Sequence, residues 1–420
     1  MDDEPIAGGT GATGQALKRR RGEPHPPAVN AQRLMSGKAW ADFCDALKTA
    51  GEQILNTEGP VSALDRAEGF QYLLGLVTAG IRQAVVLSDP DIPRFIRNPD
   101  TTSKWGAENA DNQYLWTRIR SDATYRITGK RRNAYAFLIE VKEGYMQLGD
   151  DRNFATLSSA DLQVAPDGGF DIILSAAEHP GNWIPLHPDA RYVAIRQYFY
   201  NWEQEEPAEF RIVQIGNEGR APLPLQPAHA ADMLYNAGEW IEQTMRFWNE
   251  WVVQLRAQHR PGVLAPAWHY VGGASDIYYS NDLYRLAADE AMIIETDSPT
   301  ARYWSFQLCS LWFHTFDYAN RQTSINGRQA QIDSDGRFRC VVAHQDPGVP
   351  NWLDTAGHLE GVIQYRWMWT QTNPQPAVRT VKFAEIRSAL PADTPLISAE
   401  ARREIIRKRQ EHMARREPVS

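Results

Sequence analysis

The spacing of apolar residues changes along the chain and divides it into helical and β-rich segments. Over residues 39–55 and 62–87, apolar positions recur every three or four residues, as on one face of an α-helix. From about residue 114, short alternating runs are separated by turn residues, which predicts strands of a sandwich or barrel. Helical spacing returns over 232–258 and again over 397–416. We therefore expect a mainly β protein with helices at the front, in the middle and at the end.

The apolar stripe of the second predicted helix is expected to face the protein core. This stripe consists of Leu64, Ala67, Phe70, Leu73, Leu74 and Val77.

A stretch of the β-rich region occurs twice. Residues 167–202 and 335–369 share an Asp-Gly turn, an apolar strand, a Pro-Gly, an Asn-Trp and an arginine among aromatic residues, in that order. The aligned positions include Gly168 with Gly336, Trp183 with Trp352 and Arg196 with Arg366. The separation of the copies is the size of a whole domain, so we interpret the pattern as a tandem duplication of one β-domain.

The second copy also carries motifs of a known family. These are Arg-Tyr-Trp-Ser-Phe-Gln-Leu at 302–308, Asn-Arg-Gln-Thr-Ser-Ile-Asn at 320–326, Asp335-Gly, Asn351-Trp-Leu and Tyr365-Arg. Over about the last third of the chain they resemble the bacterial family known as domain of unknown function 1214. The chain departs from the family pattern at Asp354, where proline is common, and at Trp367-Met, where Arg-x-Tyr is usual.

The resemblance implies a jelly-roll β-sandwich and, with the duplication, two of them in tandem. Such a pair resembles the double jelly rolls of certain large-virus capsid proteins, which implies a homo-oligomer, with a trimer favoured. The expected organisation is a disordered tail (1–33), a helical cap (34–110), a first jelly roll (111–229), a helical connection (230–276), a second jelly roll (277–390) and a basic C-terminal helix (391–420).

Composition and charge limit the kinds of partner and location to be expected for this protein. The chain has 420 residues and a net charge of −8, which gives no support to nucleic-acid binding. No stretch approaches a membrane span, and Cys44, Cys309 and Cys340 are too far apart for a disulfide framework, so we expect a cytoplasmic protein. The basic C-terminal helix is expected to be a solvated arm or a subunit clasp, with a nucleic-acid or acidic-lipid contact as the minor alternative.

Features kept in both copies are expected to serve the fold. The Asp-Gly pairs at Gly168 and Gly336 predict hairpin turns. Asn182 and Asn351 are expected to satisfy backbone groups in loops. The repeated arginine, at 196 and 366, is expected to stack on an aromatic ring or pair with a carboxylate.

One polar cluster occurs only in the second copy and is the first candidate site. Its members are His344, Asp346, Asp354, His358 and Glu360, close to Trp352 and Arg366. Asp354 and Glu360 are the acid/base candidates, because cleavage of a glycosidic bond needs one carboxyl group with a raised pKa and one that stays ionised.

His344 is a third catalytic candidate in this cluster. Arg366, Trp352 and His358 are candidates for substrate binding. The alternative is a solvated loop in which Asp354 caps a turn. We predict neither a metal nor a cofactor, since the His-x-His set of cupin jelly rolls is missing.

A second candidate site precedes the first sandwich, in a loop rich in Gly, Asn and Asp at 105–118. There Asp111 and Asn112 are expected to grip hydroxyl groups, while Tyr114 or Trp116 stacks on the ligand. The alternative is helix capping with core aromatics.

The leading hypothesis is a cofactor-independent hydrolase or lyase that acts on a sugar-like or polycyclic small molecule. The rival hypothesis is a non-catalytic ligand-binding or assembly protein whose double jelly roll serves oligomerisation.

Overall fold

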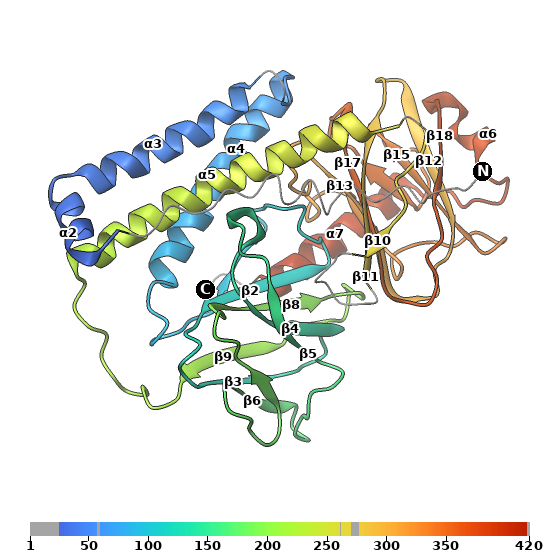
Figure 1. Ribbon diagram of the computed structural model, residues 1–420. Helices are drawn as coiled ribbons and strands as arrows, with labels where there is room; N and C mark the ends of the chain where they lie inside the picture. Colours follow the sequence, from blue (N-terminus) through green and yellow to red (C-terminus); the bar gives the residue numbers. More distant parts are fainter. Residues whose placement is uncertain (1–24, 57–58, 261, 270–276, 418–420) are drawn as a thin grey trace, which may run out of the picture.

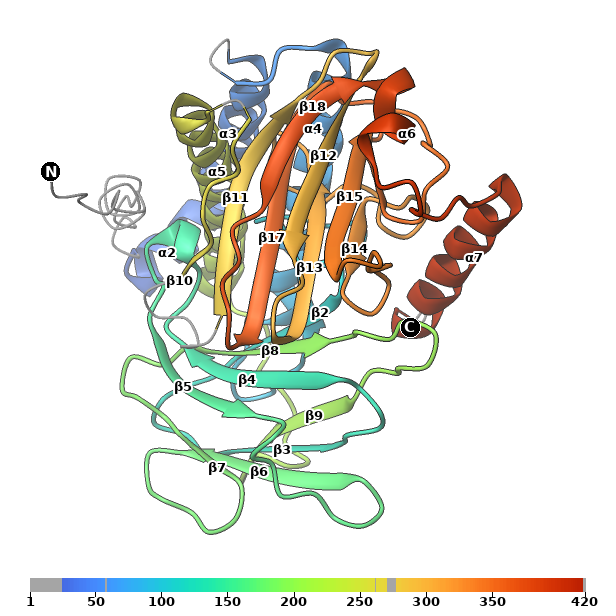
Figure 2. The ribbon, with the colours of Figure 1, turned by 90° about the vertical axis from the view of Figure 1, so that its right-hand side faces the viewer.

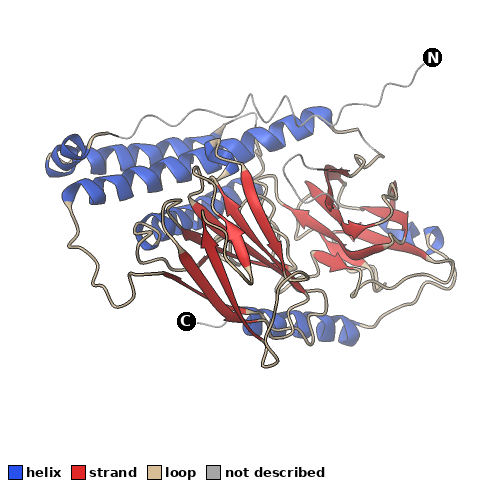
Figure 3. Cartoon of the chain, turned by 60° about the horizontal axis from the view of Figure 1, so that its bottom comes forward, coloured by secondary structure: helices blue, strands red, loops and turns tan. Residues whose placement is uncertain are grey.

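The computed structural model describes residues 25–56, 59–260, 262–269 and 277–417. Two β-sandwiches lie side by side, with a layer of long helices along one side and a further helix on the opposite side (Figures 1 and 3). The helices are α2 (Pro27–Met35), α3 (Lys38–Glu52), α4 (Ala63–Val86), α5 (Pro227–Gln258), α6 (Ile386–Ala389) and α7 (Ala399–Arg416), with 3-10 turns η1 (Gln53–Leu55), η2 (Met146–Leu148) and η3 (Phe383–Glu385). None of the described helices has the length and apolar character that a membrane crossing needs.

The first sandwich packs a five-stranded sheet, in the order β1-β2-β8-β4-β5, against a four-stranded sheet, in the order β7-β6-β3-β9. Its strands are β1 (Ile96–Arg97), β2 (Asn112–Arg118), β3 (Tyr125–Lys130), β4 (Ala136–Lys142), β5 (Asn153–Ser158), β6 (Gly169–Ser175), β7 (Trp183–Pro185), β8 (Tyr192–Tyr198) and β9 (Glu209–Gln214).

The second sandwich repeats this topology strand for strand, with sheets β10-β11-β17-β13-β14 and β16-β15-β12-β18 (Figure 2). Its strands are β10 (Trp268–His269), β11 (Ile277–Arg285), β12 (Glu290–Asp297), β13 (Ala301–Cys309), β14 (Ser324–Asn326), β15 (Arg337–Ala343), β16 (Trp352–Asp354), β17 (Glu360–Thr370) and β18 (Ala377–Lys382). Even the parallel pair recurs, as β6 with β7 and β15 with β16. The predicted duplication and the mainly β fold are confirmed.

The conserved loop features do what their repetition predicted. Gly168 and Gly336 both turn with a φ of +81°, a conformation that a side chain would strain. The amide of Asn182 donates to two backbone carbonyls, at 2.9 and 3.0 Å, and accepts from the backbone N–H of Gln163 at 2.8 Å. Asn351 makes the same three kinds of contact in the second copy, at 2.6, 2.8 and 2.9 Å.

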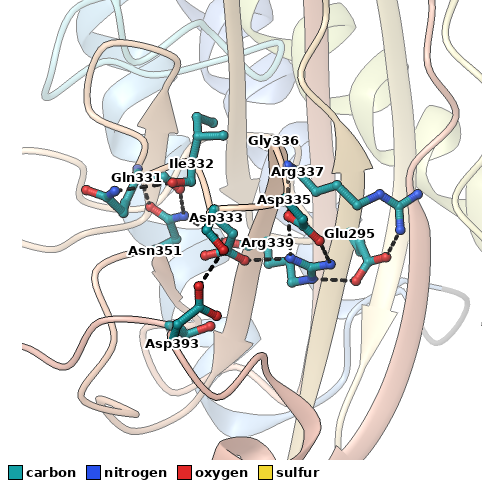
Figure 4. A network of polar contacts seen from close by, with 12 residues as sticks. Glu295, Gln331, Ile332, Asp333, Asp335, Gly336, Arg337, Arg339, Asn351 and Asp393 are labelled. Carbon is teal, nitrogen blue, oxygen red and sulfur yellow. Dashed lines mark hydrogen bonds and ion pairs between the residues drawn. The ribbon is translucent and has the colours of Figure 1, made fainter.

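The Asp-Gly turn of the second copy is also held by an ion-pair network (Figure 4). The Arg339 guanidinium lies 2.7 Å from both Asp333 and Asp335 and 2.6 Å from Glu295. Hydrogen bonding from Arg339 lowers the pKa of Asp335 to about 2. These contacts fix the loop to strand β15.

The predicted buried stripe of α4 is only partly correct, because Leu73 and Val77 pack against the core but other members do not. Leu64, Phe70 and Leu74 are exposed, while the opposite face, with Leu76 and Tyr72, is buried. The helix is apolar on both faces, so periodicity alone does not select the packed one. The other buried residues on this face are Gly69, Ala79, Gly80, Gln83 and Ala84. At Gly80 a Cβ atom would lie 2.5 Å from Ile241, so the glycine lets α4 and α5 approach closely.

The C-terminal helix is not a solvated arm. In α7, three arginines at seven-residue spacing, Arg402, Arg409 and Arg416, are buried against the rest of the chain. Arg409 donates to the backbone oxygen of Tyr318 at 2.8 Å, and Arg416 donates to that of Ala110 at 2.8 Å. Arg402 pairs with Asp346 at 2.9 Å, whereas backbone carbonyls let Arg409 and Arg416 be buried without a carboxylate partner among the described residues.

The predicted N-terminal tail falls outside the described residues up to position 24. Its end is helical, since α2 begins at Pro27, whose fixed φ suits the first turn of a helix.

Candidate functional site

A cavity of about 300 Å³ lies where the five-stranded sheets of the two sandwiches meet the central helix α5. Most of the side chains that line it come from β2, β4, β8, β11 and β17. Others come from β5, β10, α5, the loop before β2, the loop after β13 and the turn around η2. From these five main strands the lining residues are Asn112, Tyr114, Trp116, Leu138, Glu140, Lys142, Ala194, Arg196, Tyr198, Ile277, Tyr279, Asn281, Gln364, Arg366 and Met368. They occupy every second position because alternate residues of a strand face the same side.

Much of the remaining wall is aromatic. Trp105, Trp248, Trp251, Trp268 and Phe313 all line the cavity. The ring of Trp248 stacks on that of Phe313, with centroids 5.0 Å apart. Flat rings held by their neighbours form a preorganised surface for a flat ligand.

The duplication places a Tyr–Arg pair on each side of the cavity. Tyr114 on β2 lies opposite Arg196 on β8, and Tyr279 on β11 lies opposite Arg366 on β17. All four line the cavity. The repeated arginines meet the expectation made for them, since Arg196 pairs with a carboxylate and Arg366 lies over an aromatic ring, and the repeated faces also turn toward each other.

The two arginines differ in their partners. Arg196 Nε lies 3.1 Å from a carboxylate oxygen of Glu140, and this carboxylate raises the pKa of Arg196. Burial raises the pKa of Glu140, but the positive charges of Arg196 and Lys142 together outweigh burial, and the net shift is downward. Glu140 is therefore an ionised carboxylate at neutral pH.

Arg366 is almost fully buried and forms no ion pair with any described carboxylate. Its Nη2 donates to the backbone oxygen of Ala107 at 3.0 Å and to the side chain of Gln364. Its Nη1 is buried without a hydrogen-bond partner among the described residues. The Tyr279 ring centroid is 5.8 Å from the guanidinium carbon, a cation–π contact.

A carboxyl group of perturbed acidity lies at the same cavity. Glu108, in the loop before β2, is 5% exposed, and its carboxylate accepts from the hydroxyl of Thr315. Burial raises the pKa of Glu108 to about 7, against the opposing charge of Lys104. Glu108 can therefore gain or lose a proton near neutral pH.

Several buried polar atoms at the cavity lack a hydrogen-bond partner in the described structure. Besides Arg366 Nη1, they include the side-chain amide oxygens of Asn112, Gln147 and Asn281, the hydroxyl of Tyr145 and the indole nitrogen of Trp248. Buried polar groups are normally satisfied, so a cluster of unsatisfied ones in a cavity indicates a place for a polar ligand or water. Among the described residues, no three His, Cys, Asp or Glu side chains are grouped as a metal site.

Four of the residues predicted from sequence come together here, namely Asn112, Tyr114, Trp116 and Arg366. Asp111 lies behind the wall. Its carboxylate accepts from Trp202 at 2.7 Å, from Asn326 at 2.8 Å and from Tyr303 at 2.6 Å. These bonds join the two halves of the protein and occupy both oxygens of the carboxylate.

The predicted acid/base residues are not lining residues of the cavity, and each has its own partner. Asp354 pairs with Arg321 at 2.9 Å and accepts from the backbone N–H of Ala356, as expected for the turn-capping alternative. Glu360 pairs with Arg256 and Arg285, each at 3.0 Å.

The remaining candidates of that cluster also lie away from the cavity. His344 Nδ1 is 2.7 Å from the hydroxyl of Thr355, and His358 Nε2 is 2.8 Å from Glu68 on α4. The ring of Trp352 is covered by Arg402 of α7, at 5.0 Å from its centroid. These residues support the packing of helices on the second sandwich.

Sequence reasoning missed Arg196, Glu140, Tyr279 and Glu108 as site residues. The available signal was the repeated arginine, which was expected to serve the fold, together with a tyrosine on the paired strand of each copy, which was not recognised as repeated.

The comparisons with known proteins agree with this architecture. The family model described as "Protein of unknown function (DUF1214)" matches twice, over residues 108–200 and 280–371, one match in each sandwich. The match therefore extends beyond the last third of the chain. No match was found among functionally curated proteins.

Two solved structures are similar to this chain. An uncharacterised protein from Burkholderia cenocepacia is 36% identical, with a TM-score of 0.80 over 84% of this chain and 99% of that protein. A protein from Vibrio parahaemolyticus is 12% identical, with a TM-score of 0.45 over 80% of this chain and all of the other. The protein described here belongs to the DUF1214 family, and it carries that domain twice.

Proposed function

We propose that the protein binds a small organic molecule with a flat, largely apolar body in the cavity between the two sandwiches. The observation that carries this proposal is the convergence of unpartnered buried polar atoms on a cavity with aromatic walls. A mostly apolar pocket with a few convergent polar groups is the usual form of a small-molecule site, and about 300 Å³ is at the lower end of its size range.

The chemistry best suited to this cavity is general acid–base catalysis, as in a hydrolase or lyase that needs no cofactor. Glu108, with a pKa of about 7, is our candidate proton donor, and Glu140, kept ionised by Arg196, is the second carboxylate. Two carboxyl groups whose environments separate their pKa values are a recurring basis for such chemistry. This assignment takes the place of Asp354 and Glu360, whose catalytic role stays an untested prediction.

The test is a binding measurement by calorimetry and tryptophan fluorescence, with naphthalene derivatives and simple sugars as probes. Ala194 is a small, buried lining residue on β8, so Ala194→Phe fills the cavity and should abolish binding. The matched control is Ala160→Phe, which adds the same ring at an exposed turn and should leave binding unchanged. Binding that survives Ala194→Phe in a folded variant would contradict the proposed site.

Assembly is the second candidate function, and the exposed face of α4 favours it. Phe70, Leu74, Ile81 and Val85 are 46, 68, 42 and 52% exposed and lie on one side of that helix. An apolar stripe of this kind is typical of surfaces that contact another chain. Light scattering at micromolar concentration tests this candidate: a closed oligomer, such as the trimer of capsid-like double jelly rolls, would support it, and a monomer would refute it.

A further inference from the structure

The two halves of the cavity differ at one position that sets the charge beside the repeated arginine. In the first half, Glu140 on β4 lies opposite Ala194 on β8. The corresponding pair in the second half is Gln307 on β13 and Gln364 on β17. The duplicated strands therefore place a carboxylate beside Arg196 but only amides beside Arg366.

This difference leaves Arg366 as a buried cation without a compensating carboxylate among the described residues. Its side chain is held in place, because Nη2 donates to Ala107 and Gln364 and the guanidinium lies over Tyr279. The other terminal nitrogen, Nη1, remains without a partner. A buried charge is costly unless it is paired, so this arrangement favours an anion supplied by a ligand.

Three carboxylates among the described residues line the cavity, and each has a cation other than Arg366 beside it. Asp151 interacts with the charge of Lys142. Glu140 is committed to Arg196 at 3.1 Å. The Glu108 carboxylate accepts from Thr315 and interacts with the charge of Lys104.

A second unpartnered donor lies close by. The indole nitrogen of Trp248 is buried without a hydrogen bond, and its ring packs on Gly106 so closely that a Cβ atom there would lie 2.9 Å from it. The next residue, Ala107, supplies the carbonyl that holds Arg366. Two free donors around one loop suit the oxygens of a single oxyanion.

We propose that the ligand of this cavity is an anionic aromatic or polycyclic molecule whose carboxylate or sulfonate group binds Arg366 while its flat body lies against the tryptophan-rich wall. This inference rests on the proposed function and names the ligand class. The planar guanidinium fork matches an oxyanion geometrically, and charge-assisted hydrogen bonds are stronger than neutral ones.

The experiment uses the full chain and three matched probes: 2-naphthoate, naphthalene-2-sulfonate and the neutral isostere naphthalene-2-carboxamide. Calorimetry on the unmodified protein should show that both anions bind about tenfold or more tightly than the carboxamide, the expected effect of one charge-assisted contact. The variant Arg366→Gln should bring this ratio close to one and leave carboxamide binding nearly unchanged. The control Arg302→Gln, at an exposed position on β13, should keep the ratio of the unmodified protein.

A second variant keeps the inference testable if Arg366→Gln does not fold. Gln364→Glu leaves the arginine in place and gives it an internal carboxylate, because the side chain of Gln364 already accepts from Nη2. It should also remove the preference for the anions. Equal binding of the anions and the carboxamide, or a preference that survives both variants, would overturn the anion inference while the cavity stays a binding site. Failure of the unmodified protein to bind any of the three probes would contradict the proposed function and this inference with it.

Discussion

Replacing Glu108 with glutamine should change how the stability of the protein depends on pH. The carboxyl group is buried, and its pKa rises from an ordinary value of 4.5 to about 7 in the folded protein. The unfolded chain therefore releases this proton at a lower pH than the folded chain does. Between about pH 4.5 and 7 the folded state binds more protons, so its free energy of unfolding falls as the pH rises.

The size of the effect follows from the two pKa values. A difference of about 2.5 units corresponds to about 3 kcal/mol lost across that interval, at 1.36 kcal/mol per unit. Glu108→Gln removes the titration, so the variant should gain about 3 kcal/mol relative to the original chain between pH 4 and pH 8. Urea unfolding followed by circular dichroism at several pH values measures this difference. A difference between the two proteins that stays constant from pH 4 to 8 would refute the assignment of a raised pKa to Glu108.

The other predictions concern the bonds that join and anchor the duplicated halves. Asp111→Ala leaves three buried donors without their acceptor and should lower the free energy of unfolding by about 3–5 kcal/mol, while Asp111→Asn should cost clearly less; equal losses in urea unfolding would contradict the role of the carboxylate. Asn351→Ala should lower the free energy of unfolding by about 2 kcal/mol, and Asn182→Ala should lower it by less. The two asparagines make corresponding hydrogen bonds, but Asn351 is more deeply buried than Asn182. Thermal denaturation in which the Asn182 variant is the less stable one would overturn that order.

The sequence alone determined the features that depend on local contacts. Alternating runs and Asp-Gly turns predicted the strands, and their repetition predicted two sandwiches of the same topology. Asn182 and Asn351 were correctly assigned to loop anchoring, since side-chain bonds to nearby backbone groups need few distant partners.

Only the tertiary structure decided which surfaces meet. The periodicity of α4 is satisfied by either of its apolar faces, and the approach of α5 at Gly80 selects the one that is buried. The charge of α7 predicts exposure, but carbonyl oxygens presented by distant loops bury Arg409 and Arg416. In both helices the deciding partner is far away in sequence.

The candidate site shows the same division. The sequence contains the repeated Tyr and Arg, and the period of a strand puts them on one face of each sheet. Whether those faces are turned toward solvent or toward each other depends on how the two sandwiches dock. Docking makes the repeated arginines into cavity residues, and the change from Glu140 to Gln307 leaves one of them uncompensated, because the charge balance of a buried group is set by its spatial neighbours.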